Sequence, residues 1–274
     1  YTWKYQVQLD GSSTANDDTR LVIGTDMGTI GLFVTEGGMG SELAHGVGAM
    51  GVGFDYASPS SFVTHYDVSD YANIQYHTPS DMLPFGIGAK IGFAPNMGAT
   101  TQLSAKESTG LPGTQAEGRS LTMAQLSAAP IDGLTIGASY GEFGGSTGDT
   151  GQGGEGGSYY AGYTLGNATL GYSKSMVALP TAKTDTTYET VLGSKYSALL
   201  AVNDALTVSY GVEKSEATHM LSSTADVEME VTQIAAAYTT GGLTLAVSMN
   251  DYENALYTAN RDVNSTVFNV SMAF

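Results

Sequence analysis

The sequence predicts an all-β fold, a transmembrane antiparallel up-and-down β-barrel, from three observations. Apolar residues alternate with small or polar residues along most of the chain, which is typical of strands with one apolar and one wet face. The connections alternate between tight turns and long polar loops, the pattern of bacterial membrane barrels. Only 14% of the 274 residues are charged, well under the globular norm of about 25%. No stretch approaches the roughly 18 unbroken apolar residues of a membrane helix.

The composition also limits the classes of partner. The chain has 10 Lys and Arg against 27 Asp and Glu, a net charge of −17, which argues against nucleic acid. It also argues against a channel for phosphate or other anions, because such a channel needs basic rings. The absence of cysteine fits an exported bacterial protein. No signal peptide precedes the first strand, so we expect a mature or trimmed chain.

The predicted strands follow one another in period two. In the first, YTWKYQVQLD, the apolar face holds Trp3, Tyr5, Val7 and Leu9. The same alternation recurs in RLVIGT, FGIGAKIGF, LTIGASY, ATLGYSK, LTVSYGVE and LTLAVSMN. These strands run about nine to eleven residues, the length of a tilted strand that crosses a bilayer. The final strand, VFNVSMAF, alternates in the same way and ends on Phe274.

The positions of the connections predict the number of strands. Tight turns are predicted at MG after Asp26, PIDG at 130–133, GN at 166–167, ND at 203–204 and GG at 241–242. Longer polar loops are predicted at SSTAND, GGSTGDTGQGGEGG and KSEATHMLSSTADVE. These boundaries give about fourteen strands, an even number, as single-chain bacterial barrels require.

One connection is much longer than the others. It lies between GTIGLFVTE and YANIQYHTP and is rich in Gly and Met. Insertions of this size without regular structure are usually functional or disordered. This one carries apolar residues such as Leu43, Phe54 and Phe62, which need burial. The wall of the barrel lumen is one place where they can be buried.

Three stretches resemble the general porins of Gram-negative bacteria. DTRLVIGTDMGTIGLF is similar to the porin strand-turn-strand unit that leads into the third loop. SDYANIQYHTPS is similar to the strand that follows that loop, and the terminal Phe274 matches the signal that porins present to the barrel-assembly machinery. The order of elements agrees over essentially the whole chain. The compact Pro-Glu-Phe-Gly type motif often found at the tip of the porin loop is absent here.

The resemblance implies a porin architecture and location. Porins usually have sixteen strands, form homotrimers and sit in the outer membrane, in contact with lipid and lipopolysaccharide. Residues 1–274 would then be a single barrel domain, and residues 36–70 would be a third loop folded into the lumen as the constriction. Aligned on that loop, the sequence begins at the third porin strand. We therefore expect a leading hairpin beyond the fourteen visible strands; without one, the barrel has fourteen.

The resemblance also implies which charged residues line the constriction of the pore. In porins a row of arginines on the wall faces acids on the loop. Arg20 matches an arginine position of this row, and His77 occupies another, which weakens the positive side. Lys4 and Lys90 lie on the lumen face by alternation and extend it. The loop candidates for the negative side are Glu36, Glu42, Asp55, Asp67 and Asp70.

This charge pattern predicts a water-filled channel for passive diffusion of ions and small hydrophilic solutes, with weak to moderate cation preference. Each residue has a plainer alternative. Lys4 and Lys90 are either part of the constriction or solvated lumen residues away from it. His77 is either part of the positive row or a polar rim residue. Each loop acid either lines the pore or is simply solvated.

Other functions are weighed on the same residues. A substrate-specific channel for sugars or nucleosides would show aromatic residues along the lumen, whereas the inward faces are mostly small. A soluble all-β adhesin is the third alternative. The H-E-x-x-H pattern is absent, and catalysis is not expected. No cofactor or catalytic metal is expected; Asp17 and Asp18 in an external loop either bind a structural Ca²⁺ or are solvated.

Overall fold

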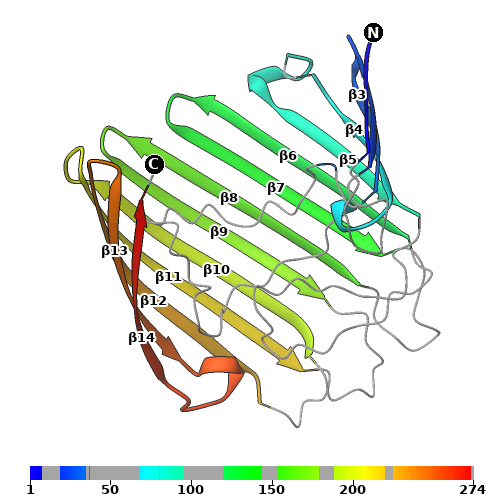
Figure 1. Cartoon of the computed structure of the whole chain (residues 1–274). Coiled ribbons are helices and arrows are strands. Elements are labelled where there is room, and N and C mark those ends of the chain that lie inside the picture. The colour runs from blue at the N-terminus through cyan, green and yellow to red at the C-terminus, as the bar shows by residue number, and fades with distance from the viewer. Residues whose placement is uncertain are drawn as a thin grey trace.

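A computed structural model shows fourteen antiparallel strands in a single sheet whose spatial order follows the chain from β1 to β14. It describes residues 1–7, 19–34, 37, 68–79, 81–95, 120–143, 154–178, 188–219 and 225–272. The sheet is strongly curved, with the first and last strands at its two rims (Figure 1). The predicted up-and-down order and the count of about fourteen strands are confirmed.

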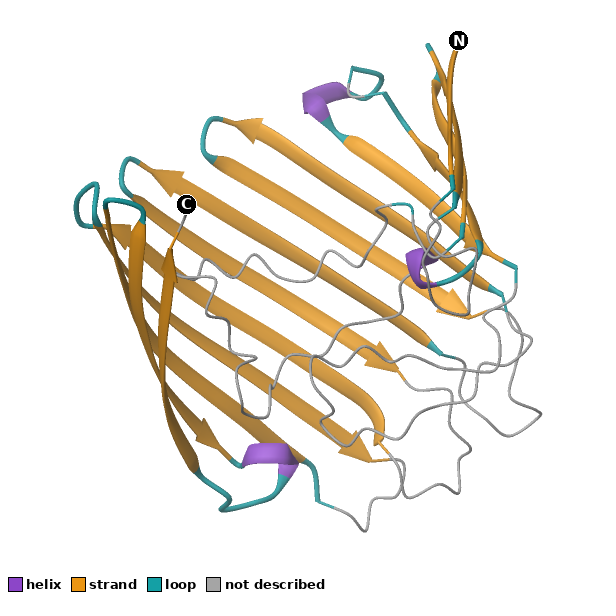
Figure 2. Ribbon diagram, viewed as in Figure 1, coloured by secondary structure: helices purple, strands orange, loops and turns teal. Residues whose placement is uncertain are grey.

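Strand length changes along the sheet, as Figure 2 shows. The first five strands have five to seven residues, the next four and the last two have ten or eleven, and three strands in between have fourteen. The bounds are β1 Thr2–Gln6, β2 Arg20–Thr25, β3 Gly28–Phe33, β4 Asn73–His77, β5 Gly88–Ala94, β6 Leu121–Ile131, β7 Leu134–Phe143, β8 Glu155–Leu165, β9 Ala168–Ala178, β10 Tyr188–Ala201, β11 Leu206–His219, β12 Val227–Thr240, β13 Leu243–Glu253 and β14 Val263–Met272. The predicted uniform length of nine to eleven residues is therefore wrong at both extremes.

The predicted tight turns all lie between paired strands. Glycine is required where the backbone turns left-handed: Gly133 has φ 78°, and a Cβ there would meet the Thr164 carbonyl oxygen at 2.2 Å. The predicted long loop at 214–228 is wrong in extent, because β11 runs to His219 and β12 starts at Val227. Polar residues alternate there as regularly as apolar ones do elsewhere, so polarity alone does not mark a loop.

Three short 3₁₀ helices complete the described structure: η1 Val68–Asp70, η2 Pro84–Gly86 and η3 Ala255–Tyr257. None of the helices in the described ranges is long and apolar enough to cross a membrane.

The two faces of the sheet differ as period two requires. The convex face carries exposed apolar side chains from β1 to β14, including Trp3, Ile91, Leu170, Ile234 and Phe268. The concave face carries the buried polar side chains, among them Gln75, Gln125, Ser175, Gln233 and Asn250. It also carries, at the strand ends away from the tight turns, a buried apolar cluster that includes Leu121, Val191 and Tyr252. A protein with a water-facing exterior has the opposite arrangement. The chain therefore turns its apolar face outward and its polar face inward, as membrane barrels do.

Candidate functional site

The concave face is the candidate site, and its first five strands carry the predicted cations. Arg20 starts β2 and donates a hydrogen bond from Nη2 to Oε1 of Gln6 on β1, at 2.7 Å. Lys4 lies two residues before Gln6 on the same face of β1, and its Cα pairs with that of Val22. Lys4 and Arg20 are thus neighbours on one rim of the sheet.

His77 and Lys90 form a second neighbouring pair. They are direct cross-strand partners on β4 and β5. His77 belongs to a chain of side-chain hydrogen bonds along β4: its Nε2 is 2.8 Å from Gln75 Oε1, and Gln75 Nε2 donates to Asn73 Oδ1 at 2.9 Å. This chain fixes the imidazole on the concave face.

The two pairs lie at different levels of the wall. Arg20 pairs with Phe33 across β2 and β3, whereas His77 pairs with Thr29 across β3 and β4. Phe33 and Thr29 are four residues apart, which is about 13 Å along a strand. The structure therefore brings Lys4 to Arg20 and Lys90 to His77, but it does not set all four at one level.

Most of the predicted acidic residues of the constriction lie outside the described residues. Glu36, Glu42, Asp55 and Asp67 lie outside the described residues. Asp70 is the last residue of η1, and only its backbone position is described. Asp17 and Asp18, the predicted calcium candidates, also lie outside the described ranges. Within those ranges, no group of three or more His, Cys, Asp or Glu residues is placed to hold a metal ion.

Both ends of the long 34–72 segment touch the concave face. Gly37 lies so close to Gln75 that a Cβ on the glycine would be 2.1 Å from the Gln75 amide nitrogen. At the other end, Val68 is fully buried in a cluster that includes Ala94 and Leu121. The helix η1 accordingly contacts β5 and β6.

A buried ion pair on the concave face was not predicted. Lys195 Nζ of β10 lies 2.6 Å from Glu213 Oε1 of β11, and their side chains are 10% and 2% exposed. They are direct cross-strand partners. Alternation in LTVSYGVE places Glu213 on the same face as Ser209 and Gly211, so the residue's inward direction was readable. Its partner was not, because the register between β10 and β11 is needed to pair the two.

Around this ion pair the wall holds neutral polar groups, and beyond them the buried apolar cluster that includes Val191 and Val231. Ser139 and Ser158 share a hydrogen bond of 3.0 Å between β7 and β8. On β12 to β14, Gln233 donates to Asn250, which donates to Ser265, at 2.8 and 3.1 Å. Among the described residues, the buried hydroxyls of Ser173, Ser175 and Ser248 have no hydrogen-bond partner. We call the concave face of β7–β13 the neutral sector, and that of β1–β5 the basic sector.

The connection between β13 and β14 also reaches inward. Tyr257 of η3 is buried, and its hydroxyl lies 2.6 Å from the hydroxyl of Ser215 on β11. Leu256 and Tyr257 both have left-handed φ angles, 58° and 54°, which are uncommon for such side chains. Asn254 supports the turn by accepting a hydrogen bond from the Asn260 backbone at 2.9 Å.

Comparison with known proteins gives a clear result for the fold. No family model matches the chain, and no curated protein matches it by sequence. Solved structures do match. An anion-selective porin from Comamonas acidovorans is 12% identical with a TM-score of 0.60, over 94% of this chain and 78% of that one. The chain has the porin fold.

Two further matches agree with the porin fold. Outer-membrane expressed OmpT of Vibrio cholerae is 13% identical with a TM-score of 0.55, over 93% of this chain and 79% of that one. The outer membrane channel DcaP of Acinetobacter baumannii is 8% identical with a TM-score of 0.56, over 94% and 82% of the two chains. At these identities the likeness establishes the fold alone. The porin resemblance seen in the three sequence stretches is confirmed at that level.

Proposed function

We propose that the chain is an outer-membrane porin that forms a water-filled channel for passive diffusion of ions and small hydrophilic solutes. The observation that carries this proposal is the arrangement of the sheet: exposed apolar side chains cover the convex face, and the buried amide, hydroxyl and charged side chains lie on the concave face, beside an apolar cluster at the strand ends away from the tight turns. Lipid cannot satisfy exposed backbone groups, so such a sheet crosses a membrane only when it is closed. A closed sheet of this size encloses an aqueous channel.

The need to close the sheet into a barrel supports an architecture of sixteen strands. Among the described residues, β1 and β14 stand at the two ends of the strand order and do not pair with each other. Each therefore presents one edge of unpaired backbone groups, which is costly in a bilayer. One further hairpin between these edges would pair both and would give sixteen strands. The intact barrel is a single domain, and its porin fold favours a homotrimer in the outer membrane.

The constriction is assigned to residues 36–70, the third loop of a sixteen-strand barrel. The close approach of Gly37 to Gln75 and the contacts of η1 with β5 and β6 support this assignment, because both ends of the segment lie on the concave face. A barrel of this width does not sort solutes without a narrowing.

The sign of the selectivity follows from the charges of that loop. Residues 34–72 contain five acidic residues and no Lys or Arg. These five acidic residues would face the basic residues Arg20, Lys4, Lys90 and His77 across the pore. The negative charges would then exceed the positive charges at the constriction. We propose a weak to moderate cation preference. The Comamonas porin is anion-selective, but at 12% identity this property does not carry over, and the acid-only loop favours the opposite sign.

Planar-bilayer recording tests this function. A potassium chloride gradient should give a reversal potential that favours potassium, and neutral sugars should pass at rates graded only by size. A reversal potential that favours chloride would contradict the cation preference. Saturable block of the current by one sugar or nucleoside class would instead indicate a substrate-specific channel.

A further inference from the structure

The side chain of Gln75, in the middle of β4, is almost completely buried on the concave face, with 1% of the residue exposed. Its direct cross-strand neighbours are Gly31 on β3 and Gly92 on β5, which have no side chains to cover it. Gly37, near the start of the 34–72 segment, comes close instead, and a Cβ on this glycine would overlap the Gln75 amide. The beginning of the segment therefore lies against the Gln75 amide.

A chain of hydrogen bonds joins the same amide to the other end of the segment. Gln75 Nε2 donates to Asn73 Oδ1 at 2.9 Å, and Asn73 Nδ2 donates to the Tyr71 carbonyl oxygen at 2.7 Å. The Tyr71 backbone nitrogen in turn donates to the Val68 carbonyl oxygen of η1 at 3.2 Å. Gln75 thus contacts the beginning of the 34–72 segment directly and its end through one side chain.

His77 fixes the orientation of the Gln75 amide. The imidazole Nε2 lies 2.8 Å from Gln75 Oε1. An amide oxygen only accepts hydrogen bonds, so His77 Nε2 is the donor and the amide nitrogen of Gln75 points toward Asn73. Three successive donors are therefore aligned from the wall toward η1, and hydrogen bonds aligned in this way strengthen one another.

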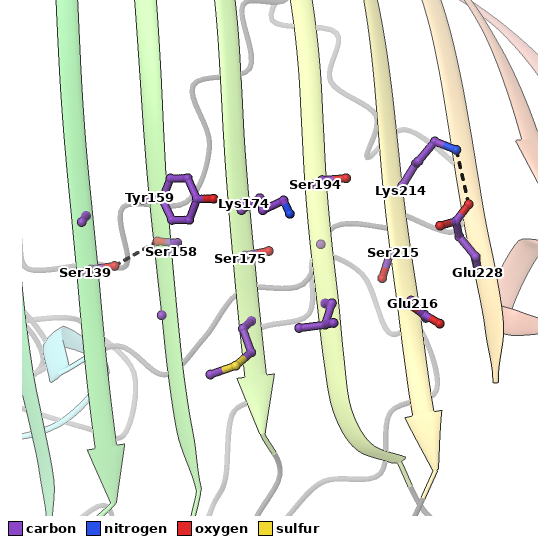
Figure 3. Close-up of a pocket in the computed structure, with 15 residues that line it drawn as sticks. Ser139, Ser158, Tyr159, Lys174, Ser175, Ser194, Lys214, Ser215, Glu216 and Glu228 are labelled. Atoms are coloured by element: carbon purple, nitrogen blue, oxygen red, sulfur yellow. Dashed lines mark hydrogen bonds and ion pairs between the residues drawn. The ribbon is translucent and has the colours of Figure 1, made fainter.

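Two other polar groups of the concave face have their hydrogen bonds across strands. Ser139 and Ser158 join β7 to β8 (Figure 3), and Gln233, Asn250 and Ser265 join β12, β13 and β14. The chain of β4 runs along a single strand instead and ends on η1. Its side chains therefore connect the wall to the 34–72 segment rather than one strand to the next.

We propose that Gln75 is a positioning residue of the channel, which holds both ends of the 34–72 segment against the wall and so sets the width of the constriction. This inference rests on the proposed function, because it requires residues 36–70 to narrow the pore. Without the Gln75 amide, Gly37 and Tyr71 lose their common point of attachment. The pore should then be wider and should accept larger solutes, while strand pairing is unchanged.

Channel recordings on variants of the full chain in planar bilayers test the proposal. Gln75→Met keeps the length of the side chain and removes its hydrogen bonds. We expect the single-channel conductance to rise about twofold, and larger uncharged polyethylene glycols to enter the pore, because both depend on the narrowest diameter. Gln233→Met is the matched control, since Gln233 is also a buried inward glutamine that donates to an asparagine. A merely structural role of the amide would affect both variants alike.

Gly37→Ala tests the same contact from the side of the segment. Its Cβ would overlap the Gln75 amide, so the conductance should rise as in Gln75→Met. Gly166→Ala is the control for this variant. Gly37 and Gly166 both have positive φ angles, 126° and 60°, but no described atom lies within 4 Å of a Cβ at Gly166. Strain of the backbone alone would therefore affect both alanine variants.

A heat-dependent gel shift establishes that each variant is folded. Unchanged conductance in either Gln75→Met or Gly37→Ala, or an equal rise in its control variant, would overturn the role of Gln75. A wild-type protein that forms no channel would overturn the proposed function instead, so the two failures are distinguishable.

Discussion

The basic and neutral sectors of the concave face use charge in different ways. In β1–β5, three basic residues and no acidic residue occur in the strands. In β7–β13, the buried charged side chains of the described residues are Lys195 and Glu213, and they neutralise each other. The charges in the strands of the basic sector are all of one sign, whereas the buried charges of the neutral sector form a pair that joins two strands.

The comparison teaches that inward direction alone does not make a residue selective. Lys90 and Lys195 are both inward lysines by alternation. Only Lys195 has a carboxylate directly opposite it on the next strand, whereas Lys90 faces His77 and Gln125. We therefore expect removal of charge to change stability in one sector and ion preference in the other.

The largest effect is expected for Glu213→Ala in the neutral sector. This change leaves the Lys195 ammonium buried without its carboxylate, which costs about 3 kcal/mol of unfolding free energy. Denaturant unfolding in detergent micelles, followed by the loss of the folded band on unheated gels, measures it. Lys90→Ala is the matched control in the basic sector and should cost far less. Equal losses in both variants would remove the distinction between the sectors.

A smaller effect is expected for Tyr257→Phe, also in the neutral sector. The variant loses the hydrogen bond with the Ser215 hydroxyl and should lower the unfolding free energy by about 1 kcal/mol. The same unfolding assay measures it. Tyr210→Phe serves as control, since Tyr210 is half exposed on the convex face. If both variants unfold alike, the inward anchoring of the β13–β14 connection does not contribute to stability.

In the basic sector, Arg20→Gln should change selectivity rather than stability. Loss of this half-buried cation should raise the potassium-to-chloride permeability ratio about twofold, the size of a solvent-screened charge interaction. The reversal potential in a potassium chloride gradient measures the ratio. Arg20→Lys retains the charge and should keep the wild-type ratio. A ratio that falls in Arg20→Gln would place Arg20 outside the field experienced by permeating ions.

The smallest effect is expected for Ser175→Ala. The hydroxyl of Ser175 is buried without a hydrogen-bond partner among the described residues, so its removal breaks no hydrogen bond within them. The unfolding free energy should change by less than about 0.5 kcal/mol. A loss above about 1 kcal/mol in the unfolding assay would show that this hydroxyl is satisfied by a group that the wall holds in place.

Much of this architecture was predictable from the sequence because period two fixes which face each residue occupies. Alternation placed Lys90 beside the inward glycines of β5 and Phe268 among the outward residues of β14. The tight turn at Gly133 was predictable from its residue types. Strand order then followed, since neighbouring strands joined by such turns must pair.

Pairing across strands was not predictable, because it depends on register, which a single strand does not encode. The ion pair between Lys195 and Glu213 arises from register. Strand ends were also missed where charged residues alternate, as in the stretch from Lys214 to Glu216. In that stretch the outward side chains are charged rather than apolar, although the backbone is still hydrogen-bonded to the neighbouring strands.

Accessibility at two adjacent residues tests the central claim most directly, namely that the concave face meets water and the convex face meets lipid. The chain has no cysteine, so single cysteines can be introduced without background. A charged, membrane-impermeant thiol reagent added to reconstituted channels should change the current of Lys90→Cys, which faces inward. It should leave Ile91→Cys unchanged, because Ile91 is an outward residue of the same strand. Modification of Ile91→Cys with no effect on Lys90→Cys would contradict the account.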